Sequence, residues 1–278
     1  PADGTYKFND NIDFKVFWSE PVDIDISSGS PRISLTIGAT SPLYATYVEA
    51  ESTPTLSVFR HTVTNTEVDA DGIAIVGNSI GLNSSTIKDL AGNDAVLTFT
   101  SPVLTGVLVD GASATILSWT PPANGTYAIG DNIDVIVHWS ENVDIVGSPY
   151  FSLWCNGGRE AHYQDGSGTQ DITFRYTVTD GDNNCSIWIS GTGVLNSGTI
   201  KDLATNDAYL TFPGAPGWTY YANIKVDGIR PTVTASTSKN ITVPANGNYF
   251  RPSQTIEYNL TFSEAVVVTG QPRLVLNI

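Results

Sequence analysis

The sequence has 278 residues, enough for about two domains at roughly 150 residues per domain, and its 41% hydrophobic content supports packed cores. Its 13 Lys and Arg residues against 28 Asp and Glu residues give a net charge of −15, which excludes nucleic acid as a partner and disfavours anionic membrane surfaces. No apolar run approaches the ~20 residues that a membrane-spanning helix needs, so we expect no membrane insertion within this segment.

In chain order, the first feature is an opening block, Pro-Ala-Asp/Asn-Gly-x-Tyr, that begins at Pro1 and returns at Pro122 and Pro244. Two further markers recur in the same order, so the chain contains an internal repeat of about 115–120 residues. These markers are Thr-Ile-Lys-Asp-Leu-Ala at residues 86–91 and 199–204, and Val-Asp-Gly at residues 109–111 and 226–228.

The repeats predict three units: residues 1–111, 112–228 and 229–278. The first lacks the lead-in that precedes the opening block of the second, and the third holds only the first part of a repeat. The chain also begins without a signal peptide. We therefore expect a processed chain or a piece cut from a longer tandem array.

Strands are predicted by alternating apolar and polar residues, and the copies agree with one another. This period-two pattern with one apolar face indicates half-buried antiparallel strands. An extra residue at Val58-Phe59, relative to the second copy, predicts a β-bulge. The predicted strands are 12–18, 33–37, 56–63, 73–76 and 96–99 in the first copy, 133–139 and 151–155 in the second, and 256–262 and 274–278 in the third.

The predicted fold class is all-β, with tandem immunoglobulin-like β-sandwich domains of about 115–120 residues each. No segment has a helical period, and Gly, Pro, Asn and Asp turns separate the strands. The second unit is expected to be an autonomous sandwich. Its predicted core includes Ile133, Val135, Val137, Trp139, Phe151 and Leu153.

The third unit would expose an apolar face that the strands of a complete repeat cover. We expect the missing strands to come from continuation of the chain, and the alternative is a strand added by another subunit. The residues of this face are Leu260, Phe262, Leu274, Leu276 and Ile278.

A resemblance follows from three motifs: the Gly-Thr-Tyr opening, the Ser-Glu pair that ends the first long strand, and the block Ile-Lys-Asp-Leu-Ala-Gly-Asn. Together they resemble the bacterial Ig-like, or cadherin-like, tandem repeats of large secreted and cell-surface proteins. The resemblance covers the whole chain and implies an extracellular or cell-surface location. Such repeats serve as stalks, adhesins, matrix or filament components, so the resemblance does not fix one function.

Catalysis is not expected. His61, His138 and His162 occupy no metal or triad spacing, and two of them align with aromatic residues of the other copy. The sequence has no nucleophile elbow, no phosphate-binding glycine loop and no His-Glu-x-x-His motif. Carboxylates recur with the repeat, whereas an active site is usually unique.

Two acidic segments could be calcium loops. Residues 67–72 carry oxygen ligands at alternate positions followed by glycine, with Asp69 and Asp71 as candidate ligands. The counterpart at 180–184 offers Asp180 and Asp182. Both could equally be Asp/Asn/Gly turns that need no metal.

A second group of acidic residues recurs near the ends of the repeats. In cadherin-like arrays, carboxylates of adjoining domains share calcium at the junction, so the resemblance implies calcium as the one cofactor here. The alternative is that the Asp-Leu-Ala-Gly-Asn block is a turn with a positive φ at Gly92 or Asn93. The recurring residues are Glu20, Asp89, Asn93, Asp94 and Asp110, then Glu141, Asp202, Asn206, Asp207 and Asp227.

Both cysteines lie in the second repeat. Cys155 takes an inward strand position that Ile37 holds in the first copy, and Cys185 has the parity of inward isoleucines. We expect a disulfide between them, and two buried thiols are the alternative.

The second repeat also carries aromatic residues where the first has small ones. Trp154 replaces Thr36 and Trp188 replaces Ala74, both on the outward face. Exposed aromatics anchor protein interfaces and stack on sugars, although they also cover loops or neighbouring domains. An enlarged segment at 213–221 adds further candidates for this surface. They are Trp218, Tyr220 and Tyr221.

Two functions remain open. The first is a structural repeat segment of an extracellular surface, filament, sheath or stalk protein, whose partners are further copies or neighbouring repeats. The second is an adhesin module that binds a glycan or a surface protein through the aromatics of the second repeat. Recurrence of one block favours the structural role, and the differences in the second repeat favour binding.

Overall fold

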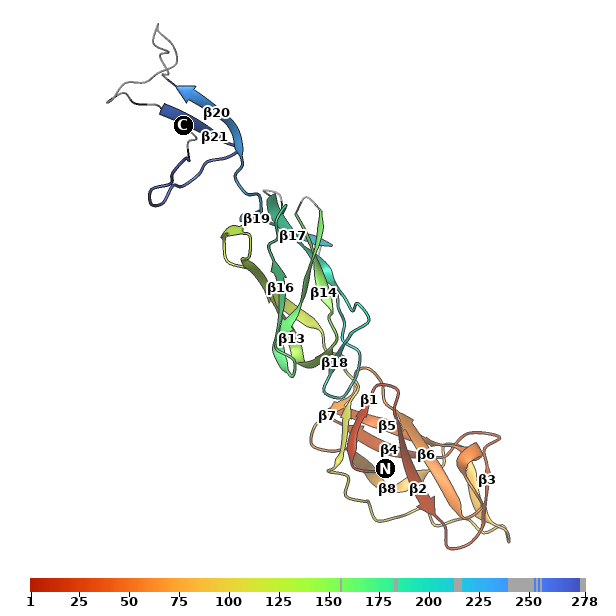
Figure 1. Cartoon of the computed structure of the whole chain (residues 1–278). Helices are drawn as coiled ribbons and strands as arrows, with labels where there is room; N and C mark the ends of the chain where they lie inside the picture. Colours follow the sequence, from red (N-terminus) through yellow and green to blue (C-terminus); the bar gives the residue numbers. More distant parts are fainter. Residues whose placement is uncertain are drawn as a thin grey trace.

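The alternating segments form antiparallel strands in the computed structural model of the chain, which describes residues 1–155, 157–182, 185–212, 217–239, 253, 255 and 257–275. The chain is all-β, built of tandem immunoglobulin-like sandwiches that follow one another end to end (Figure 1). Among the described residues, no helix has the length and apolarity needed to cross a membrane.

The first repeat has a five-stranded sheet, β2-β6-β5-β4-β8, a three-stranded sheet, β1-β10-β7, and the pair β3-β9. One short 3₁₀ helix, Glu49–Glu51, lies between two of its strands. The strands are β1 (Gly4–Lys7), β2 (Asn11–Phe17), β3 (Val22–Asp25), β4 (Arg32–Ile37), β5 (Thr40–Tyr47), β6 (Leu56–Thr62), β7 (Val68–Asp69), β8 (Ala74–Gly81), β9 (Thr86–Asp89) and β10 (Val107–Asp110).

The second repeat differs from the first in three strands: β11 is added at its start, β13 spans the segments that form β2 and β3, and no strand among its described residues corresponds to β7. Its strands pair in the order β11-β13-β16-β15-β14-β17-β19-β12, and β18 pairs with β13. The strands are β11 (Ile116–Thr120), β12 (Gly125–Ala128), β13 (Asn132–Val146), β14 (Tyr150–Trp154), β15 (Gly158–Asp165), β16 (Thr169–Thr177), β17 (Cys185–Val194), β18 (Thr199–Asp202) and β19 (Trp218–Asp227).

The first two repeats each have an apolar core of their own. The first core is formed by residues between Ile12 and Val109, and the second by residues between Ala114 and Val226. Inward-facing β13 residues, with Trp139 only 1% exposed, lie at the centre of the second core. Burying several such side chains at about 1.5–3 kcal/mol each gives every sandwich a stabilising centre of its own.

The glycine of the Val-Asp-Gly marker, at the end of each of the first two repeats, is required for steric reasons. A Cβ at Gly111 would lie 2.0 Å from the backbone oxygen of Thr64, and one at Gly228 would lie 2.3 Å from that of Thr179. Only glycine permits so close a backbone approach, so the end of each repeat is fastened to a loop of the same sandwich.

Two strand predictions are corrected. β2 pairs with β6 in unbroken register through Val58 and Phe59, so no bulge forms there, and Ser57 takes the place of Ile172. Residues 96–99 form no strand. Leu97 and Phe99 bond to the backbone of Ile80 and Asn78 in β8, but only one isolated bridge, between Ser79 and Thr98, forms there.

In the third repeat, β20 (Val233–Lys239) pairs with β21 (Glu257–Phe262). Leu260 and Leu274 are exposed and Phe262 is half-buried, so this pair presents apolar side chains to solvent. The strand expected at 274–278 is not formed at Leu274 or at the following residue, and Leu276 and Ile278 lie outside the described residues.

Candidate metal centre at the repeat junction

The site is built on a loop at the end of β18. Asp202 accepts hydrogen bonds from the backbone N–H and the side-chain Nδ2 of Asn206, both at 2.8 Å. Thr205, between them, has a φ of 72°, and Gly92 has a φ of 90° in the equivalent loop of the first repeat. The turn alternative for the Asp-Leu-Ala-Gly-Asn block therefore describes the local backbone.

The loop also contacts the first repeat directly. The Oδ1 atom of Asn206 accepts the backbone N–H of Phe8 at 3.0 Å. Its Nδ2 donates to the backbone oxygens of Asp110 at 2.8 Å and Ala112 at 3.2 Å. A fourth bond joins the Lys7 amine to the Thr205 hydroxyl at 3.1 Å. Because Asn206 is only 5% exposed, these bonds lie in a tight contact between the two repeats.

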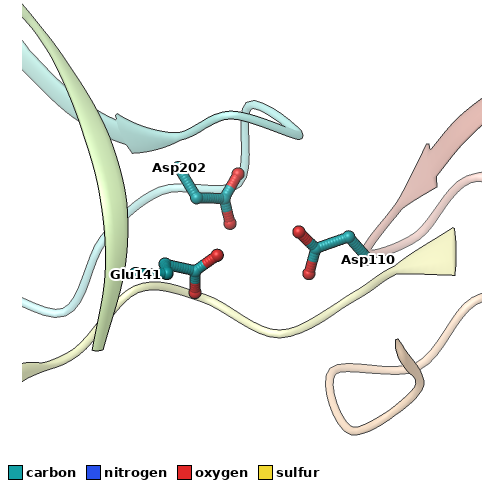
Figure 2. Close-up of side chains that lie close together, drawn as sticks. All are labelled: Asp110, Glu141 and Asp202. Carbon is teal, nitrogen blue, oxygen red and sulfur yellow. The ribbon is translucent and has the colours of Figure 1, made fainter. Parts of the chain in front are cut away.

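Beside this contact, three carboxylates converge from both repeats. Asp110 ends β10 of the first repeat, Glu141 lies within β13 and Asp202 ends β18 of the second repeat. One oxygen atom of each lies within 4.8 Å of the others, and Figure 2 shows the three groups turned toward one another. Pairing of Val143 with Asp202 between β13 and β18 holds the last two residues side by side.

The electrostatics of this cluster are unfavourable without a cation. Burial, with the charges of Asp110 and Asp202, raises the pKa of Glu141 to about 7. Burial and the charge of Asp202 also raise the pKa of Asp110. Within the described part of the chain, no basic side chain forms an ion pair with any of the three. The cluster thus carries negative charge that its surroundings do not neutralise.

The donor set fits calcium. Ca²⁺ takes six to eight oxygen ligands, and carboxylates bind it through one or both oxygens. The cluster offers carboxylate oxygen alone, with no nitrogen or sulfur ligand that would favour a softer metal. The residues present can therefore hold a hard divalent cation between the two repeats.

The other residues expected at the repeat ends do not join this cluster, which corrects the larger ligand set. Asp94 forms an ion pair with Lys88, and Asp207 forms the equivalent one with Lys201. Both carboxylates follow the Asp–Asn turn and point back to the lysine of their own hairpin. Glu20 and Asp89 lie at the far end of the first repeat, and Asp227 accepts a backbone N–H from Ile229 at the next boundary.

For the two candidate calcium loops, the described residues support the turn alternative; residues 183 and 184 of the second loop lie outside the described residues. Asp69 is buried and accepts backbone N–H groups from Gly38 and Gly72, at 2.7 and 2.8 Å. Asp182 is also buried, and Arg159 neutralises it through a bond of 2.6 Å. The remaining candidates, Asp71 and Asp180, are exposed.

The cysteines are joined in the structure. Cys155 follows β14 and Cys185 opens β17, and a disulfide links them with their Cα atoms 5.5 Å apart. The bond connects neighbouring strands close to the outward-facing aromatics Trp154 and Trp188.

Those aromatics form a row across three strands. Trp154 lies opposite Trp188, which lies opposite Tyr220 with ring centroids 4.7 Å apart. Trp154, Trp188 and Trp218 line a hollow of about 410 Å³. The prediction that Tyr221 belongs to this exposed surface is wrong: its side chain is half-buried and packs against the core of the second repeat. Residues 213–216 of the enlarged segment lie outside the described residues.

Sequence reasoning missed the partners of Asn206 across the junction. Phe8 and Asp110 contribute backbone atoms to these bonds, and every residue type has such atoms, so no side-chain pattern could have identified the bonds. The carboxylates were identifiable because they recur between copies.

Comparison with known proteins adds little to this geometry. No family model and no curated relative matches the chain. Among solved structures, a chimeric titin Z1Z2 carrying an exogenous decorin peptide is similar, at 9% identity over 77% of this chain and 93% of that chain, with a TM-score of 0.22. A marsupial T cell receptor is similar at 8% identity over 83% of this chain and 76% of that chain, with a TM-score of 0.23. At such low scores, the fold assignment rests on the strands and cores of the chain itself.

Proposed function

We propose that the chain is a structural segment of an extracellular bacterial assembly, in which sandwiches joined end to end span distance or cover a surface. The observation that carries the proposal is the contact between repeats: Asn206 bonds to Phe8 and Asp110 of the preceding repeat, and to Ala112 directly after the boundary. A flexible linker would leave the two sandwiches free to reorient, whereas this contact favours one orientation. The proposal assigns the chain no catalytic role.

Calcium is the proposed cofactor of the junction, held by Asp110, Glu141 and Asp202. When bound, the cation supplies the positive charge that these groups lack. Each carboxylate is fixed to a rigid element, so neutralising them fastens the first repeat to the second without any new protein contact. Calcium would then set the stiffness of the segment.

Small-angle scattering of the full chain, with calcium and with chelator, tests the junction. We expect an extended particle whose maximum dimension varies less when calcium is present, and loss of this effect in Glu141→Gln. Glu20→Gln is the matched control because Glu20 holds the equivalent position away from the junction. An identical scattering profile in all four cases would exclude calcium from the junction.

Location is tested separately by immunogold electron microscopy of intact cells that produce the protein, with an antibody to residues 112–228. The structural proposal requires gold particles outside the cell, in rows or at a regular distance from the envelope. Labelling only inside permeabilised cells would contradict it, whatever the result with calcium.

A second candidate function is adhesion through the aromatic row of the second repeat. It is favoured by one comparison: Trp154 and Trp188 face each other in the same register in which the first repeat pairs Thr36 with Ala74. Stacking on sugars or insertion into a protein partner would use such a row. A glycan array probed with Trp188→Ala tests it, and Tyr209→Ala, an exposed aromatic outside the hollow, is the control.

A further inference from the structure

The first repeat has an open groove along one edge of its main sheet. β2 is the terminal strand of the five-stranded sheet, so one of its edges has no partner strand among the described residues. The groove has a volume of about 910 Å³. Its lining includes Lys15, Val16 and Phe17 of β2, together with Ile33, Ile75 and Phe99.

In the second repeat, a strand fills the corresponding place. β11 pairs with β13 so that Ile116 lies opposite Trp139 and Trp119 opposite Val137. Ile116 is fully buried. The Trp119 ring packs edge-on against Phe212, with centroids 3.9 Å apart. This strand therefore completes both the sheet and the core.

The groove of the first repeat matches this place residue by residue. Val16 and Phe99 occupy the positions of Val137 and Phe212 in the repeat alignment. Val137 is fully buried under β11, while Val16 is only half-buried beside the groove. The volume of the groove thus lies where the side chain of Trp119 sits in the other repeat.

We propose that the β2 groove binds an added antiparallel β-strand with the sequence pattern of residues 112–121, Ala-Ser-Ala-Thr-Ile-Leu-Ser-Trp-Thr-Pro. The strand's backbone bonds to the open edge of β2, which gives affinity. Its tryptophan enters the groove against Val16 and Phe99, which gives register. The inference does not depend on the proposed function, because the groove is a property of the first repeat alone.

The register of the complex follows from the pairing of β11 with β13. The tryptophan of the added strand lies opposite Val16, and its isoleucine lies opposite Trp18. Ile116 and Trp119 are three residues apart, a spacing that a regular strand would place on opposite faces, but the register shift between Ile116 and Ser118 turns both inward. With that bulge kept, a slip by one residue would turn both toward solvent, so one register is favoured.

A synthetic peptide of residues 112–121, added to the full chain, tests the proposal by hydrogen exchange. We expect saturable slowing of amide exchange in residues 11–18, at least tenfold, with residues 132–139 unchanged because β11 already covers that edge. A peptide with serine at the Ile116 and Trp119 positions is the matched control and should not protect β2. Equal protection by both peptides, or none with either, would overturn the proposal.

The same experiment separates other occupants of the groove. Sedimentation of the chain without peptide reports self-association. If the chain dimerises and residues 11–18 are already protected at that concentration, the occupant is a second copy and the proposal is wrong.

A covalent version removes the dependence on peptide affinity. Pro121 directly precedes the block that aligns with Pro1, so residues 112–121 placed before Pro1 reproduce the chain connection of the second repeat. We expect the melting temperature of the first repeat to rise by about 5 °C or more, and the same graft with the two serines to leave it unchanged. No difference between the two grafts would refute strand binding.

Discussion

The Asp–Asn loop occurs twice in the described chain, once at the junction and once at the far end of the first repeat. Its internal bonds are the same: Asn206 bonds to Asp202 and Asn93 bonds to Asp89 with donor–acceptor distances between 2.7 and 2.8 Å. At the junction Asn206 is buried and bonded to the first repeat, while Asn93 is exposed. The local sequence therefore builds the loop, and only a neighbouring repeat turns it into an interface.

The carboxylates beside the two loops also differ in the direction of their pKa shifts. The side chain and then the backbone N–H of Asn93 hold the pKa of Asp89 below its ordinary value. At the junction, burial and neighbouring carboxylates raise the pKa of Glu141 instead. A loop that stabilises its own carboxylate in solvent thus becomes, in contact with another repeat, part of a site that favours a cation.

The largest effect on stability is expected from removing the disulfide, which only the second of the two sandwiches has. The bond closes a loop with a sequence separation of 30 residues, and on the chain-entropy account it contributes about 3–4 kcal/mol. The double variant Cys155→Ala/Cys185→Ala should lower the free energy of unfolding of the second repeat by that amount and leave the first unchanged. Hydrogen exchange of residues 132–146 and 11–17 reads out the two repeats separately. Equal loss in both would mean that the sandwiches unfold together.

The next largest effect is expected from removing the Asn206 side chain, which only one of the two loops uses to contact another repeat. Asn206→Ala removes the bonds to Phe8, Asp110 and Ala112 and leaves buried backbone groups unpaired, which costs about 1–3 kcal/mol at the junction. Exchange of the Phe8 amide should accelerate, and scattering should show a wider range of particle lengths.

Asn93→Ala is the control for that variant, since it loses the equivalent side-chain bond, from Nδ2 to Asp89, and no bond between repeats. If both variants changed particle length equally, the loop itself and not the contact would control the orientation of the sandwiches.

The sequence predicts the repeat-level features well because the copies can be compared. Alternation at residues 133–139 identifies β13, and the shared parity of Cys155 and Cys185 predicts their disulfide. Recurrence also selects Asp110, Glu141 and Asp202, but together with carboxylates that do not join them.

Features that depend on contacts between distant segments could not be predicted from the sequence. Asp94 and Asp89 lie five residues apart in one block, yet Asp94 bonds to Lys88 of its own hairpin while Asp89 caps the turn. Residues 96–99 alternate like a strand, but Leu97 and Phe99 bond to β8 only around the isolated bridge between Ser79 and Thr98, so no continuous ladder forms. Which recurring residue meets a neighbour is decided by the distance between sandwiches, and no local pattern encodes that distance.

A smaller effect is expected from pH, through the raised pKa of Glu141 at the junction. The pKa of Glu141 is about 7 in the folded chain against an ordinary 4.5, so the folded state favours the protonated form. Without calcium, stability of the junction should therefore be lowest above pH 7, rise as the pH falls from 7 toward 4.5, and change no further below. Calcium favours the ionised form and should stabilise the junction at pH 7.5. Thermal unfolding across this pH range measures the effect. Glu141→Gln should lose the calcium effect and most of the pH dependence, leaving the part due to Asp110, whose pKa burial also raises, and Glu20→Gln should keep both.

The smallest expected effect concerns the tryptophan that both sandwiches place at the end of their first long strand. The indole N–H of Trp18 donates to the hydroxyl of Ser57 at 2.8 Å, but that of Trp139 has no partner among the described residues because Ile172 replaces the serine. Ser57→Ala should therefore cost the first repeat about 1 kcal/mol, the net contribution of one such bond. A double-mutant cycle with Trp18→Phe isolates the bond from packing, and urea unfolding followed by hydrogen exchange measures each corner of the cycle. A coupling energy near zero would mean that the hydrogen bond contributes nothing and that Ser57 matters only for its size. The first repeat would then tolerate an unpaired indole as the second already does.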